Sequence, residues 1–319
     1  MSALVPVRPS PHLRRYGHDT VAPQGLAPEL QHWFDADGFV AFVDTGTAWV
    51  AAGSPIAPAE RLATVAARFT DAARARGRRA CFFGVERPLV DAGAFALAIG
   101  EHPVWDAWRW SDVLATSSSL RYQVRRAFNH EVRVRPRSEG EPLDAMRAVI
   151  TRWQSAHAMP PMGFLADLDA AAVTRTRRIL VAERRGQLVG FAGMLTIPSR
   201  QRVFIEHLIR APGAPNGTAE LLVDSAMREA GGCQLTLGLA PLSGSIPRWM
   251  RLTRWLGTPL YDFAGLRAFK EKLRPHTWEP VYLCTVRGSL PVALLDSLRA
   301  FAGGSLLAFA SRWARRAGW

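Results

Sequence analysis

The chain has 319 residues, of which 48% are hydrophobic and 21% charged, so it can bury a substantial core and is not an intrinsically disordered protein. Its formal net charge of +13 favours RNA, an anionic lipid surface or a phosphorylated small molecule as partner, because arginine forks bind phosphate oxygens. The three cysteines are widely spaced, no run of about 18 uncharged apolar residues occurs and no apolar leader opens the chain. We therefore expect a cytoplasmic protein without a redox centre or a membrane span.

The first half of the chain shows strand and helix patterns in a regular order. Residues 38–53 have the pattern of two short strands joined by a turn. Residues 58–77 carry apolar side chains on one helical face and arginines on the other. The continuously apolar segment 79–86 is typical of a strand buried in a sheet, and a further strand is predicted over 95–106.

Residues 119–136 form a basic bridge to the second half, with the pattern of a helix followed by a strand. Arg121 and Arg125 lie one turn apart and share a face of that helix, and Arg126 is adjacent to them. The phosphate of an RNA or of a lipid headgroup is the ligand that we expect for these three arginines. No motif for reading bases accompanies them.

The second half repeats the order of the first. The patterns predict a helix over 143–157, a hairpin over 178–197, a strand over 202–210, a helix capped by Thr218 and a strand over 233–242. This is the element order of a GNAT-type acyltransferase. We therefore predict an α/β fold with a mixed sheet, made of two GNAT-type domains in tandem.

The residues after 288 have the pattern of two apolar helical segments, separated by two glycines and ending in arginine and tryptophan. Such a tail suits a helix in the headgroup layer of a membrane, and the alternative is a helix docked on the protein's own core. Because the tail follows the last expected strand, we expect its removal from Ser289 onward to leave the core folded. The predicted parts are an N-terminal extension 1–16, a first GNAT-like domain 17–118, the bridge 119–136, a catalytic GNAT-like domain 137–288 and the helical tail 289–319.

The loop "RAPGAPNG" before the helix at Thr218 bears on the choice of acyl donor. Coenzyme A would need successive backbone N–H groups at the start of that helix. Pro212 and Pro215 each remove a donor from the loop, and Asn216-Gly217 adds a turn that favours positive φ. The sequence therefore disfavours acetyl-CoA.

Several segments resemble one protein family. The stretches "APNGTAELLVD", "LTLGLAPLSG" and "LYDFAGLRAFKEKLRPHTWEPVYL", together with the basic bridge, look like the catalytic domain of lysylphosphatidylglycerol synthases, the multiple peptide resistance factors, over roughly residues 16 to 285. The resemblance implies a tandem GNAT-type fold and transfer of an aminoacyl group from a charged tRNA to a membrane lipid hydroxyl. It implies aminoacyl-tRNA as co-substrate and no further cofactor. The chain looks like a stand-alone member without the family's transmembrane flippase half.

Transfer of an aminoacyl ester to an alcohol needs an anchor for the α-ammonium, a proton acceptor for the attacking hydroxyl and cations for the oxyanion and the RNA. Glu206, His207 and Arg210 supply such groups around one strand end. The family's Asp-x-x-Arg falls on His207 and Arg210, so Glu206 is the carboxylate that we favour, provided that a bulge or an early strand end lets it serve. The alternatives are a surface ion pair of Glu206 with Arg210 and a His207 that is hydrogen-bonded and not a general base.

Lys272 matches the inner lysine of the family's F-K-x-K segment, and we assign it to the terminal phosphate of the tRNA or to the ester carbonyl; the alternative is a solvated surface lysine. The catalytic candidates are thus Glu206, His207, Arg210 and Lys272. The candidate substrate-binding residues are Asn216, Glu220, Ser243 and Lys270, with Arg121, Arg125 and Arg126 of the bridge. The eight histidines show no metal-ligand spacing, so no metal is expected.

Three functions stay open from the sequence. The leading one is an aminoacyl-tRNA-dependent transferase that acts on a phosphatidylglycerol-like lipid, or on another hydroxyl or amine, at the inner face of the cytoplasmic membrane. The second is an acyl-CoA-dependent GNAT N-acyltransferase. The third is a non-catalytic GNAT-like module that binds RNA or anionic membranes.

Overall fold

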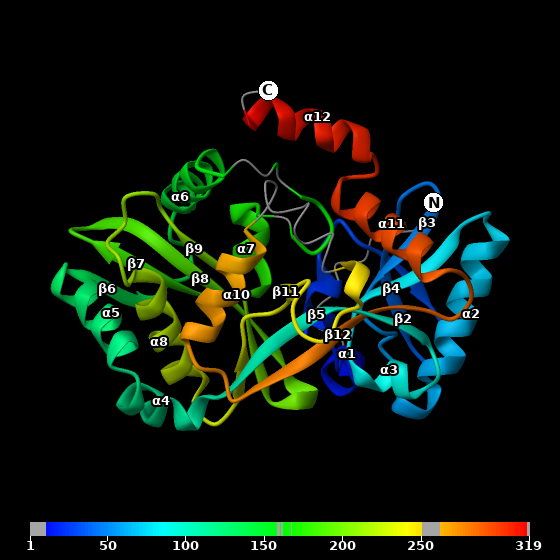
Figure 1. The fold of residues 1–319 in the computed structure, drawn as a ribbon, viewed down its shortest axis with the longest axis horizontal. Helices are drawn as coiled ribbons and strands as arrows, with labels where there is room; N and C mark the ends of the chain where they lie inside the picture. Colours follow the sequence, from blue (N-terminus) through cyan, green and yellow to red (C-terminus); the bar gives the residue numbers. More distant parts are fainter. Residues whose placement is uncertain (1–10, 158–159, 161, 167, 251–261, 318–319) are drawn as a thin grey trace.

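The fold is built on one mixed sheet with helices on both faces (Figure 1). The computed structural model describes residues 11–157, 160, 162–166, 168–250 and 262–317. The strands lie in the order β1-β2-β3-β4-β12-β5-β10-β9-β8-β7-β6, and β11 pairs with β5.

The N-terminal part and the first half have the following elements: α1 (Pro11–Tyr16), η1 (Ala22–Leu26), β1 (Gln31–Phe34), β2 (Phe39–Asp44), β3 (Ala48–Ala52), η2 (Ala59–Arg61), α2 (Leu62–Ala75), β4 (Arg79–Val85), α3 (Arg87–Asp91) and β5 (Phe95–Asp106). The connection to the second half has η3 (Ala107–Arg109), α4 (Trp110–Thr116), α5 (Ser118–Asn129) and β6 (Val132–Pro136).

The second half has α6 (Asp144–Ser155), α7 (Ala170–Thr176), β7 (Arg178–Arg184), β8 (Gln187–Ile197), η4 (Pro198–Arg200), β9 (Arg202–Arg210), α8 (Thr218–Ala230), β10 (Gln234–Thr236), β11 (Ala240–Pro241), α10 (Phe263–Lys272) and β12 (Thr277–Thr285). Two helices follow, α11 (Leu290–Phe301) and α12 (Leu306–Ala317).

The two halves repeat one motif, as the order of elements predicted. In the first half β1, β2 and β3 are antiparallel. The helix α2 connects β3 to β4, and these two strands pair in parallel. In the second half β7, β8 and β9 are antiparallel, and β9 pairs in parallel with β10 across α8. The predicted α/β class, mixed sheet and tandem GNAT-type fold are confirmed.

The halves exchange their last strands. β5 follows the first half in the chain but pairs with β10 of the second half, whereas β12 follows the second half and pairs with β4 of the first. The two exchanged strands pair with each other at the centre of the sheet, over Thr277–Thr285 of β12. Each half is therefore completed by a strand from the other.

Buried charges hold this exchange together. Glu279 of β12 accepts two hydrogen bonds from Arg202 of β9, at 2.8 and 2.9 Å, and one at 3.1 Å from His102 of β5. Arg200 pairs with Glu279 and also with Glu86, which directly follows β4. Burial alone would raise the pKa of Glu279, but the hydrogen bonds from His102 and Arg202 bring it far below its usual value. The cluster ties the two outer parts of the sheet to the exchanged pair.

The helix α11 packs into the core, which argues against the expectation that removal of the residues from Ser289 onward leaves the core folded. Ala293 and Ala300 are buried with strand residues of the first half, and Asp296 pairs with Arg79 of β4 at 2.7 Å. Of the two alternatives for the tail, α11 follows the docked one. Among the described residues no single helix is long and apolar enough to cross a membrane; the pair α11 and α12, bent by 54°, meets both criteria together.

Candidate active site

A β-bulge, one of the two conditions under which we expected Glu206 to serve, lies at Glu206. In the pairing of β8 with β9, Gly193 lies opposite His207 and the next residue, Met194, lies opposite Ile205, so Glu206 has no opposite residue. A bulge of this kind turns the extra residue out of the regular alternation. Glu206 therefore faces the side of the sheet covered by α7 and η1, as its contacts show, while Ile205 packs with the core under α8.

Glu206 is held by an ion pair and an amide. Arg177 donates to both carboxylate oxygens, at 2.8 Å to Oε1, and Gln24 of η1 donates to Oε1 at 2.7 Å. Burial alone would raise the pKa of Glu206, but the Arg177 bond and the nearby His207 lower it below its usual range. Arg210 lies opposite Gly190 of β8, and a Cβ on Gly190 would contact Leu222 of α8. Because opposite residues share a side of the sheet, Arg210 lies on the α8 side, away from Glu206. The expected alternative, a surface ion pair of Glu206 with Arg210, is wrong.

His207 is buried beside this pair. Its Nε2 lies 3.5 Å from Oε2 of Glu206, and its ring packs against Gly193. An open cavity of about 820 Å³ adjoins the same face, and four arginines are among its lining residues: Arg14, Arg137, Arg177 and Arg178. The structure thus places Glu206 and His207 behind Arg177, next to a basic cavity.

The sheet opens between β9 and β10. Along β9, β10 pairs only with Arg202–Phe204, whereas β9 itself continues to Arg210. The chain after β10 turns at Gly238, with φ of +66°, where a Cβ would press on the ring of Phe204. At the far end of β9, Arg210 donates to Asn216 of the following loop at 3.3 Å.

Four of the candidate residues lie on or beside helix α10. Lys272 lies 2.7 Å from Glu220 in the first turn of α8. Lys270 is buried and donates to the carbonyls of Gly238 and Leu239 at 2.7 and 2.8 Å, while burial, aided by the charge of Arg267, lowers its pKa to about 7. Ser243 donates to Ala240 O and lies 3.4 Å from Arg267.

The start of α8 is packed against α5. Gly217, at φ +90°, is the N-cap residue, and a Cβ there would collide with the carbonyl of Gln123 in α5. Thr218 is therefore the first residue of the helix and not its cap; its hydroxyl donates to Pro215 O at 2.7 Å. Two backbone N–H groups at this helix start are already used: Thr218 donates to Pro215 O at 3.2 Å and Leu221 to Gly217 O at 2.8 Å.

The three arginines of the bridge have different environments. Arg121 donates to the carbonyls of Leu114 and Ala115 and so caps the end of α4. Arg125 is exposed and Arg126 half-buried. The same helix exposes Tyr122 and Phe128, so α5 presents cations and aromatic rings together.

The comparisons with known proteins agree with this geometry. The family model described as "Phosphatidylglycerol lysyltransferase, C-terminal" matches residues 11–285. The chain belongs to this family. A phosphatidylglycerol lysyltransferase from Bacillus subtilis is 22% identical over 300 residues, which cover 87% of the chain and 35% of that relative. The chain thus spans about a third of the length of this family member.

Two solved structures share the fold of this chain. A C-terminal domain described as that of a lysylphosphatidylglycerol synthetase from Agrobacterium fabrum has a TM-score of 0.77 and 24% identity, covering 92% of this chain and 96% of that one. L-PGS from Bacillus licheniformis has a TM-score of 0.74 and 21% identity, covering 94% of this chain and 98% of that one. Both likenesses extend over nearly the whole chain, so the tandem arrangement is common to them.

Sequence reasoning missed three contacts of the candidate residues. Arg177 and Gln24 both bind Glu206, and Arg267 contacts Ser243. Arg267 also pairs with Glu101 at 3.0 Å and lies over the ring of Trp278. These residues come from separate parts of the chain, and no local pattern in the sequence distinguishes them from its other arginines and glutamines.

One group of metal-ligand residue types occurs in the described part of the chain. Glu86, His102 and Glu279 place one ligand atom each within 4.8 Å of the others. Arg200 and Arg202 already donate to these carboxylates, so guanidinium groups supply the positive charge there. This is the cluster that ties the exchanged strands.

Proposed function

We propose that this chain transfers an aminoacyl group from a charged tRNA to a hydroxyl group of a glycerophospholipid such as phosphatidylglycerol. The family match over residues 11–285 is the observation that carries the proposal. The position of Lys272 beside the opening between β9 and β10 supports it, because the reaction needs a cation where negative charge develops.

The reaction exchanges one ester for another. The acceptor hydroxyl attacks the carbonyl carbon of the aminoacyl ester, and a new C–O bond forms to the lipid. The bond to the ribose oxygen of the tRNA breaks, and the proton of the acceptor hydroxyl passes to that oxygen. The tetrahedral intermediate carries an oxyanion, which a positioned cation stabilises.

Lys272 is our choice for that cation. Its side chain is about one-third exposed, whereas Lys270 is buried and bound to two carbonyls. Glu220 holds the ammonium at 2.7 Å and so fixes its position. In this proposal Lys270 is a positioning residue that keeps the segment after β10 turned away from β9.

Helix α5 is the surface that we assign to the tRNA. Arg125 and Arg126 provide phosphate contacts, and Tyr122 provides an exposed ring on which an unpaired base stacks. The guanidinium of Arg133 lies over the ring of Phe128, 3.9 Å from its centroid. Neutralising several phosphates makes affinity fall steeply with salt. The packing of α5 on Gly217 also leaves little room for a coenzyme A pyrophosphate at the start of α8.

The test is a transfer assay with the purified chain. A panel of radiolabelled aminoacyl-tRNAs is incubated with phosphatidylglycerol vesicles, and the lipid extract is separated and counted. We expect a labelled lipid with one or a few of the tRNAs, and about a hundredfold loss with Lys272→Ala. The matched control is Arg185→Ala, which removes an exposed cation at the β7–β8 turn.

Two results would contradict the proposal. One is the absence of labelled lipid with every aminoacyl-tRNA under conditions in which the protein is folded. The other is consumption of acetyl-CoA with micromolar affinity, which would identify an ordinary N-acetyltransferase.

A further inference from the structure

The helix α11 has large apolar residues on both sides: Leu290, Leu294 and Phe301 pack against the core, whereas three others face outward. Its buried residues are Ala293, Asp296, Ser297 and Ala300. Val292, Leu295 and Leu298 face outward and are 38, 39 and 49% exposed. At a spacing of three residues they form a continuous apolar ridge along the helix. Contiguous apolar side chains beside polar residues are a feature of interaction surfaces, whereas single exposed leucines are not.

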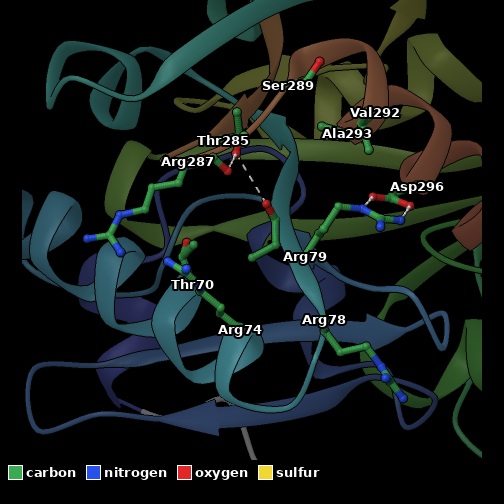
Figure 2. Close-up of a pocket in the computed structure, with 12 residues that line it drawn as sticks. Thr70, Arg74, Arg78, Arg79, Thr285, Arg287, Ser289, Val292, Ala293 and Asp296 are labelled. Atoms are coloured by element: carbon green, nitrogen blue, oxygen red, sulfur yellow. Dashed lines mark hydrogen bonds and ion pairs between the residues drawn. The ribbon is translucent and has the colours of Figure 1, made fainter.

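A basic pocket of about 300 Å³ adjoins the N-terminal end of this ridge, between α2, the start of β4, the end of β12 and α11. Figure 2 shows Ser289 and Val292 on one side of it and Thr70 and Arg74 on the other. Four guanidinium groups line the pocket: Arg74, Arg78, Arg79 and Arg287. The first turn of α11 also lines it and adds the partial positive charge of a helix N-terminus.

The charges in the pocket are only partly compensated. Asp296 is the one carboxylate among the lining residues, and it pairs with Arg79. Asp44 and Asp71 pair with Arg78 and Arg287 from outside the lining. The guanidinium group of Arg74 forms no hydrogen bond or ion pair with any residue that the structure describes. Four cations against three carboxylates leave an excess that an anion would neutralise.

The pocket and the ridge form one surface, because Val292 belongs to both. We propose that this surface is a docking site for an anionic membrane, in which the pocket binds the phosphate of a glycerophospholipid headgroup and Val292, Leu295 and Leu298 contact its acyl chains. A phosphate joined to an apolar chain matches a cation cluster that continues into an apolar ridge. A second copy of this chain fits less well, because each copy would bring a net charge of +13 and the same arginines to the contact.

This site is distinct from the candidate active site. The pocket is lined by elements of the first half and by α11, whereas Lys272 and Glu220 lie between α10 and α8 of the second half. Figure 1 shows α2 and α11 on the opposite side of the molecule from α8. The inference rests on the proposed function only in assuming that the enzyme works at a membrane; the binding itself needs no transfer.

The experiment is vesicle co-sedimentation of the full chain with phosphatidylcholine vesicles that contain or lack phosphatidylglycerol. We expect binding only with the anionic lipid. Arg74→Ala with Arg287→Ala should weaken it about 25-fold, from about fivefold for each cation at a membrane surface. Leu295→Ser with Leu298→Ser should weaken it about tenfold. The matched control is Arg87→Ala with Arg185→Ala, two exposed arginines away from the pocket, which should change it less than twofold.

Three results would overturn the inference: equal binding to vesicles without phosphatidylglycerol, unchanged binding by both pairs of variants, or a dimer that Leu295→Ser with Leu298→Ser dissociates. Thermal unfolding of each variant verifies that it is folded. Transfer to a short-chain phosphatidylglycerol in detergent separates the two proposals. The pocket variants should keep that activity, whereas a wild-type protein that binds vesicles and transfers nothing contradicts the proposed function alone.

Discussion

The ammonium of Lys272 lies 2.7 Å from the carboxylate of Glu220, which joins the last turn of α10 to the first turn of α8. This contact spans 52 residues of sequence and lies at the end of the sheet where β9 and β10 separate. It is the pair on which the proposed chemistry depends most directly.

Reversing this ion pair separates its structural and chemical roles. Lys272 is about one-third exposed but Glu220 is buried, so we expect Lys272→Ala to lower the free energy of unfolding by about 1 to 3 kcal/mol. The double variant Lys272→Glu with Glu220→Lys should restore part of that loss but leave transfer about a hundredfold down, since the cation has moved. Full activity in the double variant would show that the lysine is not needed at its own position.

Glu206 is expected to matter for stability. Glu206→Gln removes the carboxylate from the buried guanidinium of Arg177, which costs about 3 to 5 kcal/mol of unfolding free energy. The control is Glu183→Gln, which loses a partly exposed partner of Arg135 and should cost less than about 1 kcal/mol. Denaturant unfolding at neutral pH measures both.

The pH dependence of Glu206 has a definite sign. Its pKa is lower in the folded protein, so it contributes stability above the usual glutamate value near 4.5 that is lost as pH falls through the folded value. The difference in stability between wild type and Glu206→Gln should therefore shrink below about pH 4.5. A difference that stays constant down to pH 3 would contradict the charged pair.

The lowered pKa of Lys270 predicts that the free energy of unfolding depends on pH in the alkaline range. Burial lowers its pKa to about 7 in the folded protein, from 10.5. The group therefore contributes stability above pH 10.5 that is lost as pH falls toward about 7, with a slope of up to about 1.4 kcal/mol per pH unit. In Lys270→Met that slope should disappear from unfolding curves taken between pH 7 and 10. Parallel pH profiles for the two proteins would mean that the lysine stays charged.

The exchange of β5 and β12 predicts that the halves do not fold alone. Residues 1–136 lack β12, which covers the edge of β4, and residues 137–319 lack β5, which pairs with β10. An uncovered central strand exposes backbone groups and aggregates. We expect each fragment to be insoluble when it is expressed alone and a soluble complex when both are expressed together. A monomeric, cooperatively unfolding fragment would contradict this.

Truncation should distinguish the two C-terminal helices. A chain ending at Thr285 loses Ala293, Asp296 and Ala300 from the core and should unfold at a temperature at least 10 °C lower. A chain ending at Gly304 keeps α11 and should lose less than about 3 °C. Equal melting temperatures for the two truncated chains would contradict the docking of α11.

The local parts of the fold followed from sequence because their signals are local. The hairpin of β7 and β8, the helices α2 and α8 and the strand β9 each have a clear apolar period and turn residues. A bulge or an early strand end was expected at Glu206 because the family's aspartate falls one position later, on His207. A carboxylate at the neighbouring position needs an extra residue in the strand to reach the same side.

The rest depended on contacts between distant segments. Nothing near β5 or β12 marks them as exchanged, because the sequence pattern of a strand does not specify which strand it pairs with. The position of the tail stayed open for a different reason. Its apolar stripe suited both a membrane surface and the protein's own core. In the structure Leu294 and Phe301 pack against the core, whereas Leu295 and Leu298 are exposed.

The position of β12 also sets when this protein can fold during its synthesis. β4 ends at residue 85 and its partner β12 ends at residue 285, so about 200 residues must be made between them. At roughly 5 to 20 residues per second, the edge of β4 stays open on the ribosome for about 10 to 40 s. During that interval an apolar strand of the first half is available to other chains, so a chaperone that covers strand edges should raise the yield of this protein more than it does for an enzyme whose sheet closes in chain order.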